Sequence, residues 1–402
     1  MGKDAEIMGQ DAGEQSWQQL KIIKDFFQIQ EDGVMPDGSR LLLEAMDLAR
    51  FGPGEDLVTV GEPAEDGMYI ILEGSARVLT ADGTLVNELG EGDVVGELAL
   101  IKEGVRKATV KAVEQVSCAH ISRGLFQEIA DANKKVYAVL LELLYTKTTN
   151  MVRERERLRS ELEIASRIQT GFLPKSFERF CRLPNVNITA CMKPAKEVGG
   201  DFYDVFLIDE NRLCFLIADV AGKGVPASLF MTVAKTHIKN YMMLDMPLAE
   251  MAGRVNNQLN QDNEEELFVT AFICVLDTAA DCLRFVNAGH NKPYISRGGG
   301  DFVQLECSVD FVLGIMEDMP YREQMVPLEP GDRFYLYTDG VTEAFNLEEE
   351  MFSDKGMEQA LNRHMDKAGE PELLVEEMYR ELKDFSRGAA QSDDITMVYL
   401  AR

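Results

Sequence analysis

The stretch Phe215-Leu-Ile-Ala-Asp-Val-Ala-Gly-Lys-Gly-Val-Pro-Ala227 decides the fold of the C-terminal half of the chain. The apolar run from Phe215 to Ala218 predicts the end of a buried strand, and Asp219 follows it directly. Glycines then allow a sharp turn, and Pro226 is typical of the first turn of a helix. This stretch therefore predicts a carboxylate that a strand holds rigidly at the edge of a sheet.

Three other aspartate segments in this half stand next to glycine or at one end of an apolar run. They are Gly199-Gly-Asp-Phe-Tyr-Asp204, Thr338-Asp-Gly340 and Ser392-Asp-Asp-Ile-Thr396. Each alone is explained as a turn former or helix cap. Together they indicate a cation site, because carboxylate oxygens without histidine or thiolate favour Mg²⁺ or Mn²⁺ over zinc. Two such ions can activate a water and clamp a phosphoryl group.

The surrounding pattern predicts an α/β layered domain, because strand-like runs enclose paired helical stretches. Helices are expected at residues 226–245 and 247–260, with further helix around 355–385. Strands are expected at residues 212–218, 268–276, 282–287, 333–337 and 395–400.

Residues 173–402 resemble the metal-dependent protein phosphatase (PPM) family, in its SpoIIE/RsbU-like branch. The segment Ile168-Gln169…Leu173-Pro174 is similar to the linker that precedes this domain. The motifs that carry the resemblance are Glu197-Val-Gly-Gly-Asp-Phe-Tyr-Asp204, Asp219-Val-Ala-Gly-Lys-Gly-Val-Pro-Ala227, Asn287-Ala-Gly-His-Asn291, Tyr337-Thr-Asp-Gly-Val-Thr-Glu-Ala344 and Ser392-Asp-Asp-Ile-Thr396. The resemblance implies an α/β sandwich with central antiparallel sheets. It also implies a protein serine/threonine phosphatase whose substrate is a phosphoserine or phosphothreonine protein, such as an anti-sigma-factor antagonist.

The resemblance further implies a role for each motif carboxylate. Asp219 would bridge two Mn²⁺ or Mg²⁺ ions, Asp339 and Asp393 would hold one ion, and Asp201 would hold the other. Asp219 and Asp201 are thus the expected catalytic residues, with attack by hydroxide and no phosphoenzyme. Asp394 has two interpretations: it positions the ligands, or it is itself the ligand if the motif register is shifted by one residue.

The chain departs from the eukaryotic branch of the family, in which a histidine follows the bridging Asp-Gly pair and can protonate the leaving group. Here Val220, whose carbonyl is a further expected metal ligand, and Ala221 follow Asp219. We expect metal-bound water to supply the proton, with Lys223 assisting electrostatically. His290 is a possible substitute, although a hydrogen-bonded turn histidine is the favoured interpretation.

Between residues 41 and 122 short apolar runs alternate with turn signals, which predicts a small β-roll or barrel. Strands are expected at residues 68–72, 76–80 and 108–112, and Asp82-Gly83 is typical of a hairpin turn. Before them, residues 15–30 have the apolar spacing of a helix, with Trp17 among its apolar positions.

Two segments in this region suggest a phosphate site: Gly96-Glu-Leu-Ala-Leu100 and Arg106-Lys-Ala-Thr109. A glycine-led turn offers backbone N–H groups, and an arginine makes charge-assisted bonds to phosphate. Alone, Glu97 and Arg106 are explained by default as a surface ion pair.

Residues 41–122 as a whole resemble a cyclic nucleotide-binding domain. The further motifs are Phe51-Gly-Pro-Gly-Glu55, Gly61-Glu62, Met68-Tyr-Ile-Ile-Leu-Glu-Gly74 and Gly92-Asp93. The resemblance implies that Glu97 binds the ribose and Arg106 the phosphate of cAMP or cGMP. The full expected contact set is Gly96, Glu97, Leu98, Ala99, Arg106, Lys107 and Ala108. Lys107 and Val105 depart from the family pattern, which leaves the choice of nucleotide open.

Glycine and proline are absent between Leu125 and Thr170, which predicts a long helix. Its apolar residues recur every seven positions and predict a coiled-coil homodimer: Tyr137, Leu144, Met151, Leu158, Ala165 and Phe172. The second seam is polar in the middle, where Lys147, Glu154 and Glu161 stand, so a rigid spacer helix is the alternative.

The expected organisation is an α+β multidomain chain. It comprises a cyclic nucleotide-binding-like β-roll (residues 14–135), a helical coiled-coil linker (136–172) and an α/β sandwich phosphatase domain (173–402).

Composition limits the partners. The net charge of −28 opposes nucleic-acid binding, which requires positive charge. Seven cysteines without a CxxC pair are typical of a reducing compartment. With no long apolar run and no signal-peptide pattern, we expect a cytoplasmic protein without a membrane partner. The functional hypothesis is a phosphatase controlled by a cyclic nucleotide; the alternative is a catalytically silent pseudophosphatase scaffold.

Overall fold

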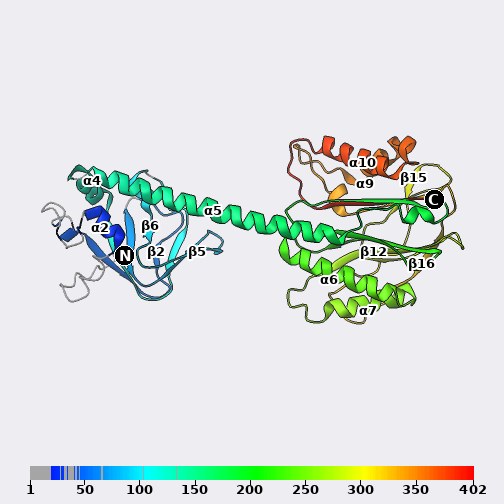
Figure 1. The fold of residues 1–402 in the computed structure, drawn as a ribbon, viewed down its shortest axis with the longest axis horizontal. Coiled ribbons are helices and arrows are strands. Elements are labelled where there is room, and N and C mark those ends of the chain that lie inside the picture. Colours follow the sequence, from blue (N-terminus) through cyan, green and yellow to red (C-terminus); the bar gives the residue numbers. More distant parts are fainter. Residues whose placement is uncertain are drawn as a thin grey trace. The chain divides into compact units, whose positions relative to one another are not determined.

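The computed structural model describes residues 20–402, except positions 28, 31–33, 35–39, 41–42, 45, 65–66, 103 and 133. It divides into two compact units, Met1–Glu154 and Arg155–Arg402 (Figure 1). The expected start of the sensor domain at residue 14 and the apolar position Trp17 lie outside the described residues. Among the helices of the described residues, none has the length and apolarity that crossing a membrane requires.

The first unit contains a β-roll made of two four-stranded antiparallel sheets, with strand orders β1-β8-β3-β6 and β2-β7-β4-β5. Both sheets contribute to one apolar core, which includes Ile71 of β3 and Val110 of β7. The Asp82-Gly83 turn joins β4 to β5 as expected, with Gly83 at a φ of +87°. The strands are β1 (Asp47–Phe51), β2 (Asp56–Val58), β3 (Met68–Glu73), β4 (Ala76–Leu79), β5 (Leu85–Leu89), β6 (Val94–Val95), β7 (Thr109–Ala112) and β8 (Val116–Ile121).

Helices cover one side of this roll. The described helices are α2 (Lys21–Phe27), the 3-10 helix η1 (Glu97–Leu100), α4 (Arg123–Ala132) and α5 (Lys135–Phe172). The first turns of α5 are anchored because Val136 and Leu140 are buried with Phe26 and Phe126 in a second core. The predicted linker helix is therefore present as α5. Its apolar seam is largely exposed in the single chain, with Met151 68% exposed, so the coiled coil stays a prediction.

The second unit is a sandwich of two five-stranded antiparallel sheets, which confirms the predicted α/β sandwich. The first sheet has the order β10-β11-β12-β13-β16 and the second β15-β14-β17-β18-β9. The first consists of β10 (Phe202–Leu207), β11 (Arg212–Val220), β12 (Val269–Asp277), β13 (Cys282–Ala288) and β16 (Gln324–Pro327). The second consists of β9 (Asn187–Lys193), β14 (Tyr294–Ser296), β15 (Phe302–Gln304), β17 (Arg333–Tyr337) and β18 (Ile395–Ala401).

Apolar side chains of the two sheets pack directly against each other. Phe215 of β11 meets Phe334 of β17 edge to face, with ring centroids 6.2 Å apart. Burying one such ring stabilises the fold by about 1.5–3 kcal/mol. This packing fixes the edges of the two sheets relative to each other, and the site lies at one of these edges.

Helices cover both outer faces of the sandwich (Figure 1). The pair α6 (Val225–Met242) and α7 (Leu248–Asn260) packs on the first sheet, and α9 (Ser353–Arg363) and α10 (Pro371–Phe385) pack on the second. Short segments complete the unit: α8 (Asp339–Thr342), η2 (Phe180–Arg182) and η3 (Met365–Lys367). The helix expected to run to residue 245 ends earlier, at Met242. Asp245 has a φ of +54°, which a right-handed helix cannot accommodate.

Candidate active site and nucleotide site

The first sheet brings two of the predicted aspartates together. Asp219 is the second-last residue of β11, and Asp201 directly precedes β10. These strands are antiparallel neighbours with Phe202 opposite Ala218. The start of β10 and the end of β11 therefore meet at one edge of the sheet, where the charge of Asp219 acts on Asp201.

The second sheet brings two more aspartates to its own edge. Asp339 lies two residues after β17, and Asp393 lies two residues before β18. Because Tyr337 pairs with Met397 in an antiparallel ladder, the end of β17 meets the start of β18. Asp219 experiences the charges of both Asp339 and Asp393, so the two sheet edges face one another.

Asp201, Asp219, Asp339 and Asp393 together form an acidic cluster at these edges. Asp201 is its most buried carboxylate, with 1% of its surface exposed. Its Oδ2 accepts hydrogen bonds from Thr338 Oγ1 at 2.8 Å and Thr396 Oγ1 at 2.6 Å. Burial raises the pKa of Asp201 well above its usual range, and the charge of Asp219 raises it further. Both threonines stand in the aspartate motifs, but sequence reasoning assigned them no role.

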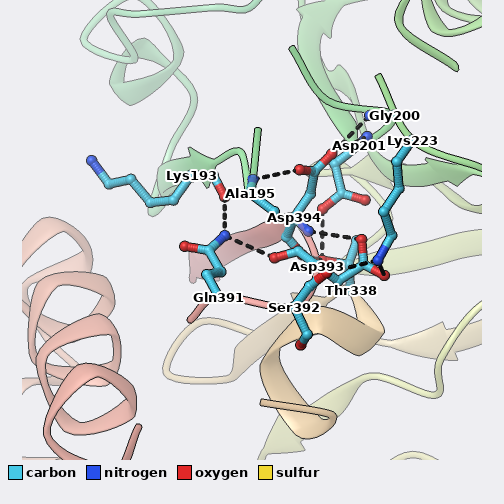
Figure 2. Close-up of polar contacts among 10 residues, drawn as sticks. All are labelled: Lys193, Ala195, Gly200, Asp201, Lys223, Thr338, Gln391, Ser392, Asp393 and Asp394. Atoms are coloured by element: carbon cyan, nitrogen blue, oxygen red, sulfur yellow. Dashed lines mark hydrogen bonds and ion pairs between the residues drawn. The ribbon is translucent and has the colours of Figure 1, made fainter. Parts of the chain in front are cut away.

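Asp394 holds the loop that carries Asp201 (Figure 2). Its Oδ1 accepts the N–H of Ala195 at 2.7 Å, and its Oδ2 accepts the N–H of Gly200 at 2.7 Å. A side chain at Gly199 would collide with this carboxylate, so glycine is required there. Both oxygens are thus engaged by the backbone, which favours the positioning interpretation over direct metal ligation.

Lys223 reaches into the acidic cluster (Figure 2). Its Nζ lies 2.8 Å from Asp393 Oδ2 and donates to the carbonyl of Ser392 at 2.7 Å. The bond to Asp393 raises the pKa of Lys223, so it is cationic at neutral pH. One ammonium does not balance the cluster. Burial, and then repulsion from Asp339, raise the pKa of Asp219 to about 7.

The donor set fits a hard divalent cation, because it offers only oxygen atoms and carries uncompensated negative charge. Among the described residues, no group of three or more histidine, cysteine, aspartate or glutamate side chains is already arranged as a metal site. Lys223 takes one oxygen of Asp393, and the threonine hydroxyls take one of Asp201. The chemistry of a cation site is therefore present, and its ligand geometry is not preformed. Val220 ends β11 with its carbonyl oxygen beside Gly200, and its role as a metal ligand stays a prediction.

The linker helix contacts this site directly. Gln169 of α5 is buried, and its Nε2 donates to the carbonyl of Gly199 at 2.6 Å. The N–H of Gly199 donates back to Gln169 Oε1 at 3.2 Å. The end of α5 thus binds the backbone two residues before Asp201. The sequence placed Gln169 in the linker motif but assigned it no contact.

His290 is a buried turn histidine, as favoured. Its Nδ1 lies 2.8 Å from Thr270 Oγ1 and its Nε2 3.1 Å from the carbonyl of Tyr337. The backbone N–H of His290 donates to Asn287 Oδ1 at 2.8 Å. Burial lowers the pKa of His290 to about 4, so the ring is neutral at physiological pH. With both ring nitrogens engaged, His290 is poorly suited to protonate a leaving group.

The first unit brings the two halves of the predicted nucleotide site together. Gly96 has a φ of +78° and begins η1, and Arg106 reaches back to it. Arg106 Nη2 donates to the carbonyl of Gly67 at 2.8 Å and Nη1 to that of Gly96 at 3.4 Å. Glu97 and Arg106 are both buried.

The remaining expected contact residues are placed less uniformly. Leu98 and Lys107 are exposed, Ala99 is buried and Ala108 is half-buried. Glu97 is paired with Lys147 of α5, with Oε1 and Nζ 2.8 Å apart. Sequence reasoning had noted Lys147 only as a polar residue of the second seam.

The fold of the second unit is that of the PP2C-type phosphatases. It resembles the SiaA-PP2C domain of Pseudomonas aeruginosa with a TM-score of 0.54 and 24% identity, covering 62% of this chain and 98% of that domain. Residues 209–402 match the family model for Stage II sporulation protein E (SpoIIE), and residues 48–133 match the cyclic nucleotide-binding domain. The C-terminal part of the chain is thus similar to the SpoIIE branch of the PPM family, and the part before it is similar to cyclic nucleotide-binding domains.

Two curated relatives extend the comparison. Phosphoserine phosphatase RsbU of Bacillus subtilis is 29% identical over 251 residues, which cover 61% of this chain and 71% of RsbU. Protein IcfG of Synechocystis sp. is 28% identical over 271 residues. That match covers 61% of this chain and 42% of IcfG, so the chain spans less than half of that relative.

Proposed function

We propose that the second unit is a metal-dependent protein serine/threonine phosphatase. The observation that carries this proposal is the convergence of Asp201, Asp219, Asp339 and Asp393 from two sheets onto one edge. Burial, and then repulsion among these carboxylates, raise the pKa of Asp219 to about 7, which a bound cation would offset. The similarity to RsbU, a phosphoserine phosphatase, supports the same reaction class.

In this proposal Asp219, the carbonyl of Val220, Asp339, Asp393 and Asp201 hold two Mg²⁺ or Mn²⁺ ions. Such a pair, when bound, generates a nucleophile from water at neutral pH and neutralises a phosphoryl group.

The protein's other contributions are positional. Thr338 and Thr396 orient Asp201 through their hydroxyls. Asp394 fixes the loop before Asp201 through two backbone N–H groups. Lys223 places a positive charge at the mouth of the cluster, where it can attract a phosphorylated substrate. Leaving-group protonation falls to water rather than to His290, whose ring is neutral and doubly hydrogen-bonded.

The proposed substrate is a phosphoserine or phosphothreonine protein of the anti-sigma-factor antagonist type, by analogy with the RsbU-like branch. The test is Mn²⁺-dependent phosphate release from a phosphoserine protein by the full chain. We expect release by the wild type and none by Asp219→Asn. Equal release by the two proteins would remove the assignment. Nucleotide binding without release by the wild type would favour the pseudophosphatase alternative.

We further propose that a cyclic nucleotide, cAMP or cGMP, binds the first unit and regulates the phosphatase through the linker. The contact of Gln169 with Gly199 supports this proposal, because a change at the end of α5 would act on the loop before Asp201. This proposal assigns residues 14–135 to the sensor domain, residues 136–172 to the linker and residues 173–402 to the phosphatase domain. If saturating cAMP or cGMP binds and leaves the phosphatase rate unchanged, the regulatory proposal is wrong.

The exposed apolar seam of α5 supports a homodimer formed through this helix, with Met151 and Leu158 among its contacts. We expect the full chain to sediment as a dimer and Leu158→Glu to sediment as a monomer. A monomeric wild type at micromolar concentration would exclude a stable dimer.

A further inference from the structure

An ion pair links the nucleotide site to the linker helix. Glu97, whose side chain is 9% exposed, accepts a hydrogen bond from Lys147, whose side chain is 43% exposed. The lysine belongs to α5, fifty positions later in the chain. Its Nζ also lies 3.5 Å from the carbonyl of Val94, at the end of the strand before the site. Lys147 therefore belongs to the site by position, although it lies outside both nucleotide motifs.

The charges at this site explain why such a lysine is needed. Glu97 is negative and Lys147 is positive, so the pair carries no net charge. A cyclic nucleotide brings one further negative charge. Without Lys147, that charge would lie near an uncompensated carboxylate in a largely buried position, which is unfavourable.

Geometry adds a second role. The ribose hydroxyl that the proposed function assigns to Glu97 is neutral, so it cannot replace Lys147 as the counter-ion. Glu97 can instead use one oxygen for Lys147 and the other for the hydroxyl, since a carboxylate accepts several hydrogen bonds. The ammonium then fixes the orientation in which the carboxylate receives the ribose.

We propose that Lys147 is a positioning residue of the nucleotide site, contributed by the linker helix. It neutralises Glu97 and orients it toward the ribose 2′-hydroxyl. An occupied nucleotide site is therefore connected to α5 by the Glu97–Lys147 ion pair. The proposal rests on the proposed function in one respect, because it assumes that a cyclic nucleotide binds here.

The first test is titration calorimetry of the full-length protein with cAMP and cGMP. We expect Lys147→Met to weaken binding on the order of tenfold, the value of one charge-assisted hydrogen bond. Lys147→Arg keeps the charge and should bind within a few-fold of the wild type. Arg153→Met removes an exposed positive charge from the same helix and serves as the matched control, with unchanged affinity.

A second readout separates positioning from a general effect of charge or folding. The wild type should prefer cAMP over its 2′-deoxy analogue, because Glu97 receives the hydroxyl. In Lys147→Met this preference should shrink, since the carboxylate is no longer oriented. An unchanged affinity, or an unchanged preference at reduced affinity, would overturn the proposal.

The failures of the inference and of the proposed function are distinguishable. Lys147→Met should unfold cooperatively on heating, as the wild type does, which shows that the variant folds. If the wild type binds neither nucleotide, the regulatory proposal fails and this inference fails with it. If the wild type binds and Lys147→Met binds equally well, the inference alone fails.

Discussion

The nucleotide site and the active site each place a lysine ammonium 2.8 Å from a carboxylate, and they differ in the charge that remains. In the first, Lys147 balances Glu97, so an anionic ligand would meet no uncompensated carboxylate in this pair. In the second, Lys223 faces Asp393 while three more aspartates stay uncompensated. The comparison teaches that similar ion pairs leave the first site suited to an anionic ligand and the second to cations.

The largest effect is expected from removing the central charge of the acidic cluster. Asp219→Asn should lower Mn²⁺-dependent phosphate release by roughly a hundredfold to a thousandfold, as the loss of one key electrostatic group does in enzymes. Steady-state release of phosphate measures this. Asp301→Asn, at an exposed position of the same unit, is the control and should keep full activity. Comparable losses in both variants would show that the effect is not local.

A third ion pair tests how much burial increases the loss of stability when one partner of the pair is removed. Lys235 of α6 and Asp204 of β10 form an ion pair in which both side chains are almost fully buried. Lys235→Met would leave Asp204 charged and unpaired, which should lower the free energy of unfolding by about 3–5 kcal/mol. Urea denaturation measures this value.

The control for this pair is exposed. Arg254→Met breaks the ion pair with Glu250 on α7 and should cost less than about 1 kcal/mol. Equal losses in the two variants would contradict the role assigned to burial.

Burial of the His290 ring should make the stability of the protein depend on pH. The folded pKa of about 4 lies below the value of about 6.5 in an unfolded chain. The neutral ring therefore contributes stability above pH 6.5, and this is lost as the pH falls toward 4. The loss amounts to about 3 kcal/mol. We expect unfolding of the wild type to become easier over this range, and His290→Gln to show a smaller change.

The smallest effect is expected at Lys223, because its side chain is partly exposed. Lys223→Met should tighten Mn²⁺ binding by about threefold, since the ammonium no longer competes for Asp393. Calorimetry with Mn²⁺ alone measures it. Lys292→Met breaks an ion pair with Glu306 and is the control. Weaker Mn²⁺ binding in Lys223→Met would contradict competition and would assign the lysine a supporting role.

The sequence predicted the acidic cluster because its aspartates adjoin the apolar runs that became β11, β17 and β18. Antiparallel pairing of such strands brings their ends together, so local pattern and topology agree. The strand and turn pattern also predicted the β-roll and a layered α/β domain, whereas the antiparallel sandwich was implied by the resemblance. The early end of α6 could not, because it depends on the left-handed backbone of Asp245.

The contacts that complete each site could not be predicted, because they depend on tertiary register. Lys147 looked like a polar defect in a coiled-coil seam until α5 packed on the roll and placed it at Glu97. Gln169 is chemically ordinary, and only its burial against Gly199 gives it a role. The two interpretations of Asp394 could be weighed only once the N–H groups of Ala195 and Gly200 were located.

The peptide of Gly199 has a practical use. Its amide proton is donated to a side chain of the linker helix, in a buried position beside the proposed catalytic carboxylates. The exchange rate of that single proton with deuterium therefore reports whether the helix end is seated. An isotope-labelled protein would reveal the state of the linker without substrate, metal or any assay of turnover.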